Sequence, residues 1–222
     1  MMSETSVDRS VWRARAVAWE LLGLSLRYPD AVLVNAVIGG GWADAAEEII
    51  AALSLKLPSD WSKGVDEPRD TEALLFTLRA EATHLFVGAP TPACSPYEGV
   101  WRAEADGVQA LMFVSPYSLE VEQFAGACGL GRPEGTNEPL DHVSTECELL
   151  QYLASLCAGE LPSEGTPAVE NLPGGSPEAA YSSFFNEHAE TWLPHFVESL
   201  AIEARHPFYY AAAMLLGAMM KA

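Results

Sequence analysis

Three acidic residues and one histidine gather within nine residues near the middle of the chain, beside a proline. They are Glu138, Asp141, His142 and Glu146, and Pro139 restricts the backbone where a helix is expected to begin. Acids at a helix start are ordinarily stabilised by the helix dipole, and Asp141 could cap the helix. This structural interpretation accounts for Asp141 but not for the gathering of the others. Carboxylates and a histidine beside an apolar groove would suit a ligand that carries arginines and an apolar helix.

A second set of residues indicates metal chemistry instead. Six residues follow the ligand order of ferritin-like di-iron bundles: Glu20, Glu81, His84, Glu146, Glu203 and His206. A glutamate three residues before a histidine places both side chains on one helix face. His206 directly precedes Pro207, where helical geometry is disfavoured, so the second pair should not converge on a metal. A di-iron or other metal-dependent helical-bundle enzyme is the alternative to a binding protein.

The elements that must position these residues are helical nearly throughout. Apolar residues recur at helical spacing, as in the stripe of Trp12, Ala16 and Trp19. We predict helices over residues 11–26, 30–38, 42–55, 70–87, 115–128, 140–158 and from 176 onward, with interruptions near Pro194 and Pro207. No run of alternating β-branched residues is long enough to need a sheet, so the predicted fold class is all-α.

The chain is expected to form a single helical-bundle domain over residues 1–222. Residues 159–176 are rich in Pro, Gly, Ser and Glu and are long for a connection in a compact domain. We therefore predict a flexible linker there, before the C-terminal helices. Such a linker would permit either a monomer or a dimer in which the terminal helices are exchanged between chains.

The composition argues against several classes of partner. The chain contains 31 Asp and Glu residues but only 12 Lys and Arg, which gives a formal net charge of −19. Binding to nucleic acid or to anionic membrane surfaces depends on Lys and Arg, so neither is expected. No signal peptide is visible, and the apolar stretch after Pro207 is too short for stable membrane insertion, so we expect a cytoplasmic protein. The four cysteines form no C-x-x-C pair, and we expect them to be thiols of the core or loops.

The clustered acids belong to a pattern that resembles a known signature. The segment Glu138-Pro139-x-Asp141-His142-x-x-x-Glu146 is similar to the E-P-x-D-H-x-x-x-E motif of the TorD/DmsD family. Members of that family are cytoplasmic chaperones for molybdopterin oxidoreductases, and they are also called redox enzyme maturation proteins.

A second segment, about forty residues upstream, supports the same resemblance. Residues 96–101 (PYEGVW) resemble the P-Y-E-S-V-[YW] stretch of the family. Gly99 stands where the family usually has a serine, so any role of a hydroxyl group there is in question. The resemblance covers roughly residues 12–216.

The resemblance implies an all-helical chaperone that is not an enzyme and needs no cofactor. Its partners would be the twin-arginine leader and the apo body of a molybdopterin oxidoreductase, whose export it would hold back during cofactor insertion. The residues expected at the leader-binding site are Glu138, Pro139, Asp141, His142, Glu146, Tyr97, Glu98 and Trp101. Glu146 would either orient His142 or contact the leader, and Trp101 would either line the groove or pack in the core. A weak nucleotide interaction is a further alternative, although the sequence contains no phosphate-binding loop.

Overall fold

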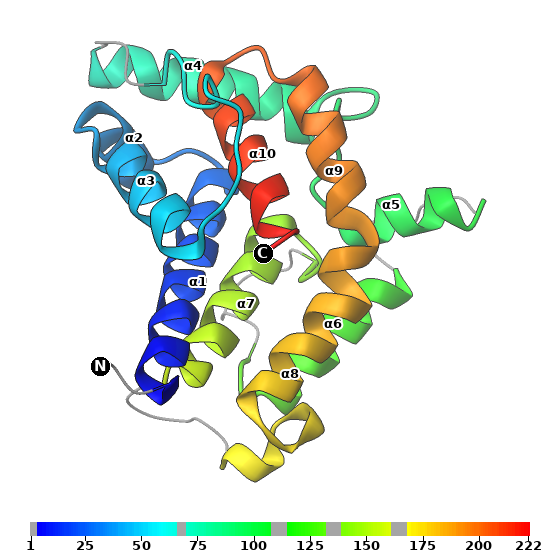
Figure 1. The fold of residues 1–222 in the computed structure, drawn as a ribbon. Helices are drawn as coiled ribbons and strands as arrows, with labels where there is room; N and C mark the ends of the chain where they lie inside the picture. Colours follow the sequence, from blue (N-terminus) through cyan, green and yellow to red (C-terminus); the bar gives the residue numbers. More distant parts are fainter. Residues whose placement is uncertain (1–3, 66–69, 108–114, 132–138, 161–167) are drawn as a thin grey trace. The chain divides into compact units, whose positions relative to one another are not determined.

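The computed structural model describes residues 4–65, 70–107, 115–131, 139–160 and 168–222 (Figure 1). Its elements are α1 (Glu4–Leu26), α2 (Ala31–Ile38), α3 (Gly41–Leu53), α4 (Thr71–Ala82), η1 (Thr83–Val87), α5 (Glu98–Ala105), α6 (Pro116–Ala127), α7 (Val143–Cys157), η2 (Val169–Asn171), η3 (Pro173–Gly175), α8 (Pro177–Phe184), η4 (Phe185–Ala189), α9 (Glu190–Glu203) and α10 (Pro207–Met219). Within these ranges, extended pairing is limited to an isolated antiparallel bridge between Tyr97 and His142. The all-α fold class is therefore confirmed.

Several helices begin at the capping residues that the sequence indicates. The side chains of Asp30, Asp70, Ser115 and Ser176 accept backbone N–H groups in the first turns of α2, α4, α6 and α8, at 3.0–3.2 Å. These bonds satisfy donors that a helix leaves unpaired at its start. Proline follows both serines at the first helical position, where its missing N–H costs little. The predicted starts of these helices are confirmed.

Two features around the motifs differ from the prediction. The sequence did not indicate α5, which follows the proline-rich loop and is too short for a clear apolar repeat. α7 begins with His142 as its cap, because His142 Nδ1 accepts the Ser144 N–H at 3.1 Å. Asp141, which the sequence offered as a possible cap of this helix, contacts α5 instead.

The C-terminal helices differ from the prediction at one of the two prolines. α9 continues through Pro194, whereas an interruption was expected there. The π-turn η4 lies immediately before α9, and such wide turns absorb irregular backbone hydrogen bonding. The interruption near Pro207 is confirmed, because α9 ends at Glu203 and Pro207 is the first residue of α10.

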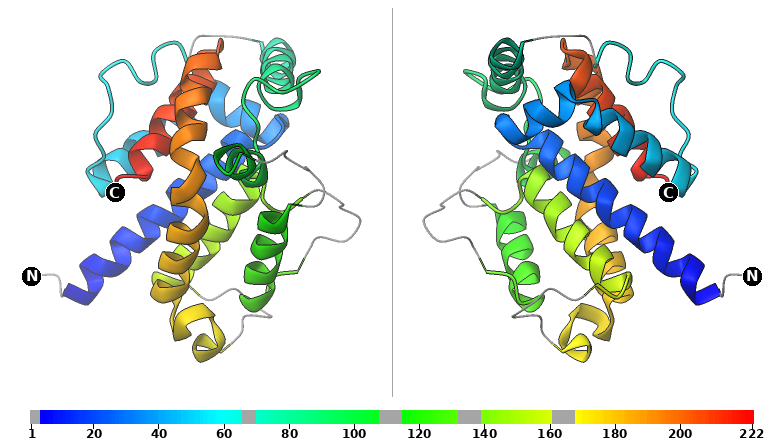
Figure 2. Two further views of the ribbon diagram at one scale, coloured as in Figure 1. Left: turned by 90° about the vertical axis from the view of Figure 1, so that its right-hand side faces the viewer. Right: turned by 90° about the vertical axis from the view of Figure 1, so that its left-hand side faces the viewer.

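The chain divides into two compact units. The first unit contains residues 1–20 and 97–192. Within it α7 packs against α8 (Figure 2). Trp19 donates from Nε1 to the Tyr181 hydroxyl at 2.9 Å, so the one polar atom of this buried indole is satisfied.

The predicted linker lies inside the first unit. Residues 168–176 of it contain the short helices η2 and η3, and residues 161–167 fall outside the described ranges. The single-domain organisation, the flexibility of the linker and the exchange of helices between chains therefore stay predictions.

The second unit contains residues 21–96 and 193–222, and aromatic side chains fill its core. Trp42 packs edge-on against Phe208 with 5.2 Å between ring centroids, and its Nε1 donates to Ser25 Oγ at 2.8 Å. Such pairs combine a large buried apolar area with a satisfied indole N–H.

The residues considered for metal binding in this unit hold the turn between α9 and α10. Glu81 Oε1 accepts the backbone N–H groups of Arg205 at 2.6 Å and of His206 at 3.3 Å. His206 Nδ1 accepts the N–H of Phe208 at 3.2 Å and so caps α10. As Pro207 predicts, His206 lies outside a helix. Among the residues that the structure describes, no group of three or more His, Cys, Asp and Glu could hold a metal ion.

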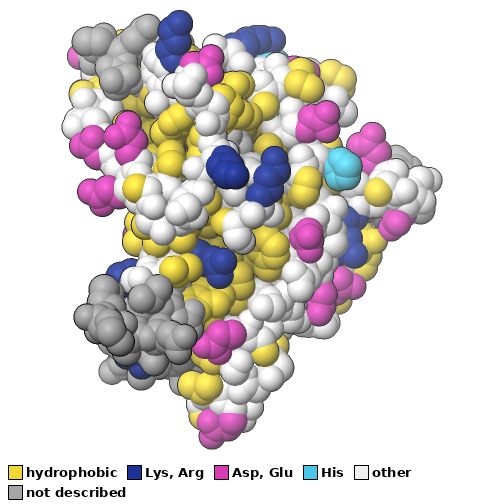
Figure 3. Space-filling model, viewed as in Figure 1, with side chains coloured by type: hydrophobic (Ala, Val, Ile, Leu, Met, Phe, Trp, Pro, Cys, Tyr) yellow, Lys and Arg dark blue, Asp and Glu magenta, His cyan; other side chains and the backbone are white. Residues whose placement is uncertain are grey.

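Many acidic residues lie on the surface, and the four cysteines lie in the interior. Acidic side chains are spread over the visible face in Figure 3 and do not form one patch. All four cysteines are buried free thiols, which confirms their expected place in the core. In the described ranges no single helix is long and apolar enough to cross a membrane. Residues 9–26 and 31–38 reach that length and apolar composition only together, as a pair bent by 114°.

Candidate functional site

Asp141 joins the two sequence motifs. Its backbone oxygen accepts the N–H of Glu98 at 3.0 Å, and its Oδ2 accepts the N–H of Gly99 at 2.9 Å. Both donors lie at the start of α5, which has no side-chain cap from its own capping residue. A carboxylate at this place satisfies an unpaired donor and faces the positive end of the helix dipole. The segment around Asp141 therefore determines where α5 begins.

Gly99 allows this close approach. A Cβ added at Gly99 would lie 2.7 Å from Ser115 Cβ and 2.9 Å from Asp141 Oδ2, and it would overlap Ser115 Oγ. Ser115 is itself held in place because it caps α6. The glycine at this motif position is thus matched by a serine at position 115 that fills the space beside Asp141.

Three motif carboxylates lie together in the interior of the first unit, and we call Glu98, Asp141 and Glu146 the buried acid cluster. Each of these residues is at most 1% exposed. Two donors serve Glu98: Arg102 Nη1 at 2.7 Å from Oε1, and His188 Nδ1 at 2.9 Å from Oε2. Glu98 is therefore the best-compensated charge of the cluster.

Glu146 has a different partner from the expected one. Its Oε2 accepts the Trp192 Nε1–H at 3.0 Å. The prediction that Glu146 orients His142 is not supported, because His142 Nδ1 is held by Ser144, whose N–H donates to it. Glu146 thus ties α7 to the start of α9 inside the first unit.

The protonation of the cluster follows from its surroundings. Burial and the nearby charge of Glu98 raise the pKa of Glu146 well above its ordinary value, against the lowering effect of the Trp192 N–H. Burial also raises the pKa of Asp141, while the Gly99 N–H lowers it. Asp141 Oδ1 and Glu146 Oε1 have no hydrogen-bond partner among the described residues. The cluster therefore favours a retained proton, and Glu146 is the carboxyl group best placed to carry it.

His142 presents a neutral ring. Burial lowers its pKa to about 4, so the imidazole is uncharged at neutral pH. Because Nδ1 accepts the Ser144 N–H, the ring proton is on Nε2. The ring packs edge-on against Tyr97, with centroids 5.2 Å apart. His142 can therefore donate a hydrogen bond without repelling an arginine.

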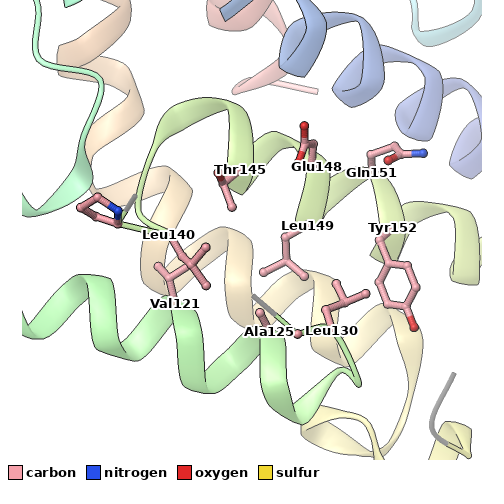
Figure 4. Close-up of a pocket in the computed structure, with 11 residues that line it drawn as sticks. Val121, Ala125, Leu130, Leu140, Thr145, Glu148, Leu149, Gln151 and Tyr152 are labelled. Atoms are coloured by element: carbon pink, nitrogen blue, oxygen red, sulfur yellow. The ribbon is translucent and has the colours of Figure 1, made fainter. Parts of the chain in front are cut away.

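An apolar cavity of about 420 Å³ lies between α6 and α7 in the first unit (Figure 4). Val121 and Ala125 of α6 face Leu149 of α7 across it. Its remaining lining residues are Leu130, Gly131, Pro139, Leu140, Thr145, Glu148, Gln151 and Tyr152. The cavity thus combines an apolar floor with a few polar groups, as peptide grooves and ligand sites commonly do.

The predicted site residues fall into three groups. Glu138 lies outside the described residues. Pro139 lines the cavity, and Tyr97, Trp101 and His142 are half-buried. The members of the buried acid cluster face inward and contact other residues of the first unit. A direct contact between a leader and any of these residues stays a prediction.

Some residues of the site were not predicted from the sequence. Arg102, His188, Trp192 and Ser115 hold the buried acid cluster and its glycine. Arg102 carries a detectable signal, because it follows Glu98 by one helical turn. The others are far away in sequence, and only the fold brings them to the cluster.

We expect substitution by glutamine to affect stability differently at the two glutamates of the cluster. Glu98→Gln places an NH₂ group against the donors of Arg102 and His188, so the free energy of unfolding should fall by about 3 kcal/mol. Glu146→Gln imitates the protonated carboxyl group and still accepts from Trp192, so stability should be unchanged or higher. Urea unfolding followed by tryptophan fluorescence measures both changes. Equal losses at the two positions would contradict this assignment of charge.

The same measurement at several pH values tests the proton on Glu146. The folded-state pKa is raised, so the stabilising effect of this proton is complete below about pH 4.5 and is lost as the pH rises. The advantage of Glu146→Gln over the wild type should therefore grow from about pH 5 to about pH 8. A constant difference across this range would show that Glu146 is ionised throughout.

The packing of Gly99 predicts a compensating pair of substitutions. Gly99→Ser should lower the free energy of unfolding by about 1–3 kcal/mol, because the new side chain overlaps Ser115. Ser115→Gly should cost only a few tenths of a kcal/mol, since glycine is an acceptable cap. The double variant should recover most of the loss in thermal unfolding. If Gly99→Ser costs the same with and without Ser115→Gly, the proposed overlap is wrong.

Comparisons with known proteins agree with the motifs and the fold. Residues 40–198 match the family model described as nitrate reductase delta subunit. The chaperone protein TorD of Vibrio cholerae serotype O1 is 27% identical over 138 residues, which are 62% of this chain and 56% of that protein. The chaperone protein TorD of Photobacterium profundum is 23% identical over 163 residues, 73% of this chain and 69% of that protein. The alignment therefore spans little more than half the length of the Vibrio protein.

A solved structure shows the same fold. A redox enzyme maturation protein from Archaeoglobus fulgidus superposes with a TM-score of 0.54 at 20% identity, covering 93% of this chain and 94% of that one. The family model covers well over half of the chain and includes both motifs. The chain therefore belongs to the nitrate reductase delta subunit family, and the resemblance to the TorD/DmsD proteins is confirmed.

Proposed function

We propose that the chain is a non-catalytic cytoplasmic chaperone that binds the twin-arginine leader of a molybdopterin oxidoreductase. It would also hold the apo body of that enzyme and delay its export until the cofactor is inserted. Family membership and relatives named as TorD chaperones support this general role. Leader binding is the finer part of the proposal, and it depends on the site in the first unit.

The apolar cavity beside the motif carries this proposal. A twin-arginine leader joins an arginine pair to an apolar segment that readily forms a helix. Along α7 the cavity runs from Thr145 to Tyr152, about 10 Å at the usual helical rise. That length matches two turns of a bound helix, whose side chains at i and i+3 or i+4 would enter the cavity.

Charge provides the second support. The net charge of −19 exerts a long-range attraction on a leader that carries arginines. Because salt screens this attraction, association should weaken as the salt concentration increases. Glu148 is exposed at the cavity and can pair with a guanidinium group. The neutral ring of His142 adds a donor close by that does not oppose this positive charge.

The predicted site residues take two roles in this proposal. Pro139, Tyr97, Trp101 and His142, with Glu138, would contact the leader. Glu98, Asp141 and Glu146 would hold those residues in position from within the first unit, because their present contacts are internal.

Two alanines of α6 allow a matched test of the cavity. Ala125 lines the cavity, whereas Ala127 lies two residues along the same helix and is exposed. Ala125→Phe should fill the cavity and weaken binding of a synthetic twin-arginine leader peptide at least tenfold, about 1.4 kcal/mol, in titration calorimetry. Ala127→Phe adds the same side chain outside the cavity and should leave the affinity unchanged.

Circular dichroism of both variants checks that each one folds. If the wild type binds the leader no better than a peptide with lysines in place of both arginines, arginine recognition is wrong. If Ala125→Phe binds as tightly as Ala127→Phe, the leader lies elsewhere on the chain.

A further inference from the structure

Glu146 lies among more negative charge than the donors around it can balance. Arg102 and His188 both serve Glu98, and Asp141 Oδ2 is held by the Gly99 N–H at 2.9 Å. The donor that serves Glu146 within the described residues is the Trp192 N–H. The titratable groups that act on Glu146 are Glu98 of α5 and Asp141 before α7, with Cys147 next to it on its own helix. Arg102 of α5 and His188 of η4 reach the cluster through Glu98.

Two carboxyl oxygens of the cluster have acceptor capacity that no described residue uses. Asp141 Oδ1 and Glu146 Oε1 are buried oxygens without a hydrogen-bond partner in the described part of the chain. An unsatisfied buried acceptor is costly, and an isolated buried carboxylate costs still more. A proton or a guanidinium group would remove both costs, because either one balances the charge.

Two members of the cluster directly follow residues of the cavity lining in the chain. Leu140 lines the cavity, and the next residue, Asp141, is buried; Thr145 lines it, and the next residue, Glu146, is buried. A leader arginine held at this wall would therefore contact residues that are chain neighbours of both carboxylic acids. Its charge could act on Glu146 from there without full entry into the interior, because buried charges are poorly screened.

We propose that leader binding is coupled to the release of a proton. Glu146 carries this proton in the free chaperone and releases it when a leader arginine binds. This inference rests on the proposed function. The O–H bond of the Glu146 carboxyl group breaks, the proton passes to solvent, and the guanidinium group remains charged at the cavity wall, where its positive charge stabilises the carboxylate. One positive charge thus replaces another, and the charge of the cluster stays balanced. Binding should strengthen as the pH rises, because the proton that must leave is then held less often.

Titration calorimetry of the whole chain in two buffers measures the released protons. A synthetic twin-arginine leader peptide is titrated in phosphate and in Tris at the same pH, since these buffers differ in their enthalpy of protonation. The difference in observed heat should correspond to about one proton released per peptide. Over about pH 6 to pH 8, the affinity should rise by up to tenfold per pH unit.

Two controls test whether Glu146 is the source of the proton and whether the arginine charge causes its release. Glu146→Gln should release no proton, while Glu104→Gln, the same change at an exposed position of α5, should behave as the wild type. A peptide with citrulline in place of both arginines has a similar shape but no charge, and it should also release no proton. If Glu146→Gln does not fold, the pH series and the two-buffer comparison on the wild type still show whether leader binding releases a proton, and absence of release overturns the coupling.

The outcomes separate this inference from the proposed function. Tight leader binding with no proton release and no dependence on pH overturns the proton coupling and leaves the chaperone role intact. Proton release that persists in Glu146→Gln also overturns it, because another group is then the source. No leader binding at any pH overturns the proposed function itself. Release of about one proton, lost with Glu146→Gln and with citrulline, supports the coupling.

Discussion

The site depends on the pairing of one aspartate with the start of a helix that is distant in sequence. α5 begins without a side-chain cap of its own, and Asp141 satisfies its first two N–H groups through a backbone and a side-chain oxygen. With Ser115 in place, this contact leaves room only for a glycine at position 99, and it places Glu98 in the interior. Once Glu98 is there, Arg102 and His188 are needed to balance it. The two motifs are therefore parts of one structural unit.

The contact between Asp141 and α5 separates the motif residues into those that hold the helices together and those that could contact a ligand. The three carboxylates that are buried cannot be exposed without breaking bonds that hold α5, α7 and α9, so they organise the site. Under the proposed function, recognition would be left to half-buried rings such as Tyr97 and His142 and to the apolar cavity between α6 and α7. The large net negative charge would accelerate the approach of the proposed basic leader, and the cavity would select its apolar part. The rate of association and the selectivity for an apolar segment would thus have different physical sources.

Local sequence signals predicted the helices and the motif, and long-range contacts account for what was missed. Asp30, Asp70, Ser115 and Ser176 act within one turn, so their capping roles could be read directly. The capping role of Asp141 could not, because the helix that it caps begins about forty residues earlier. The partners of the cluster, such as Trp192, are likewise distant in sequence. The position of the cavity depends on how α6 and α7 pack, which periodicity alone does not determine.

The location of leader binding between α6 and α7 is the central claim, and hydrogen–deuterium exchange tests it most directly. Exchange would be measured on the free chain and on the chain saturated with a twin-arginine leader peptide. The account predicts slower exchange in residues 116–131 and 139–152, with α4 and α10 unchanged. Protection confined to α4 or α10, with none at α6 and α7, would contradict it.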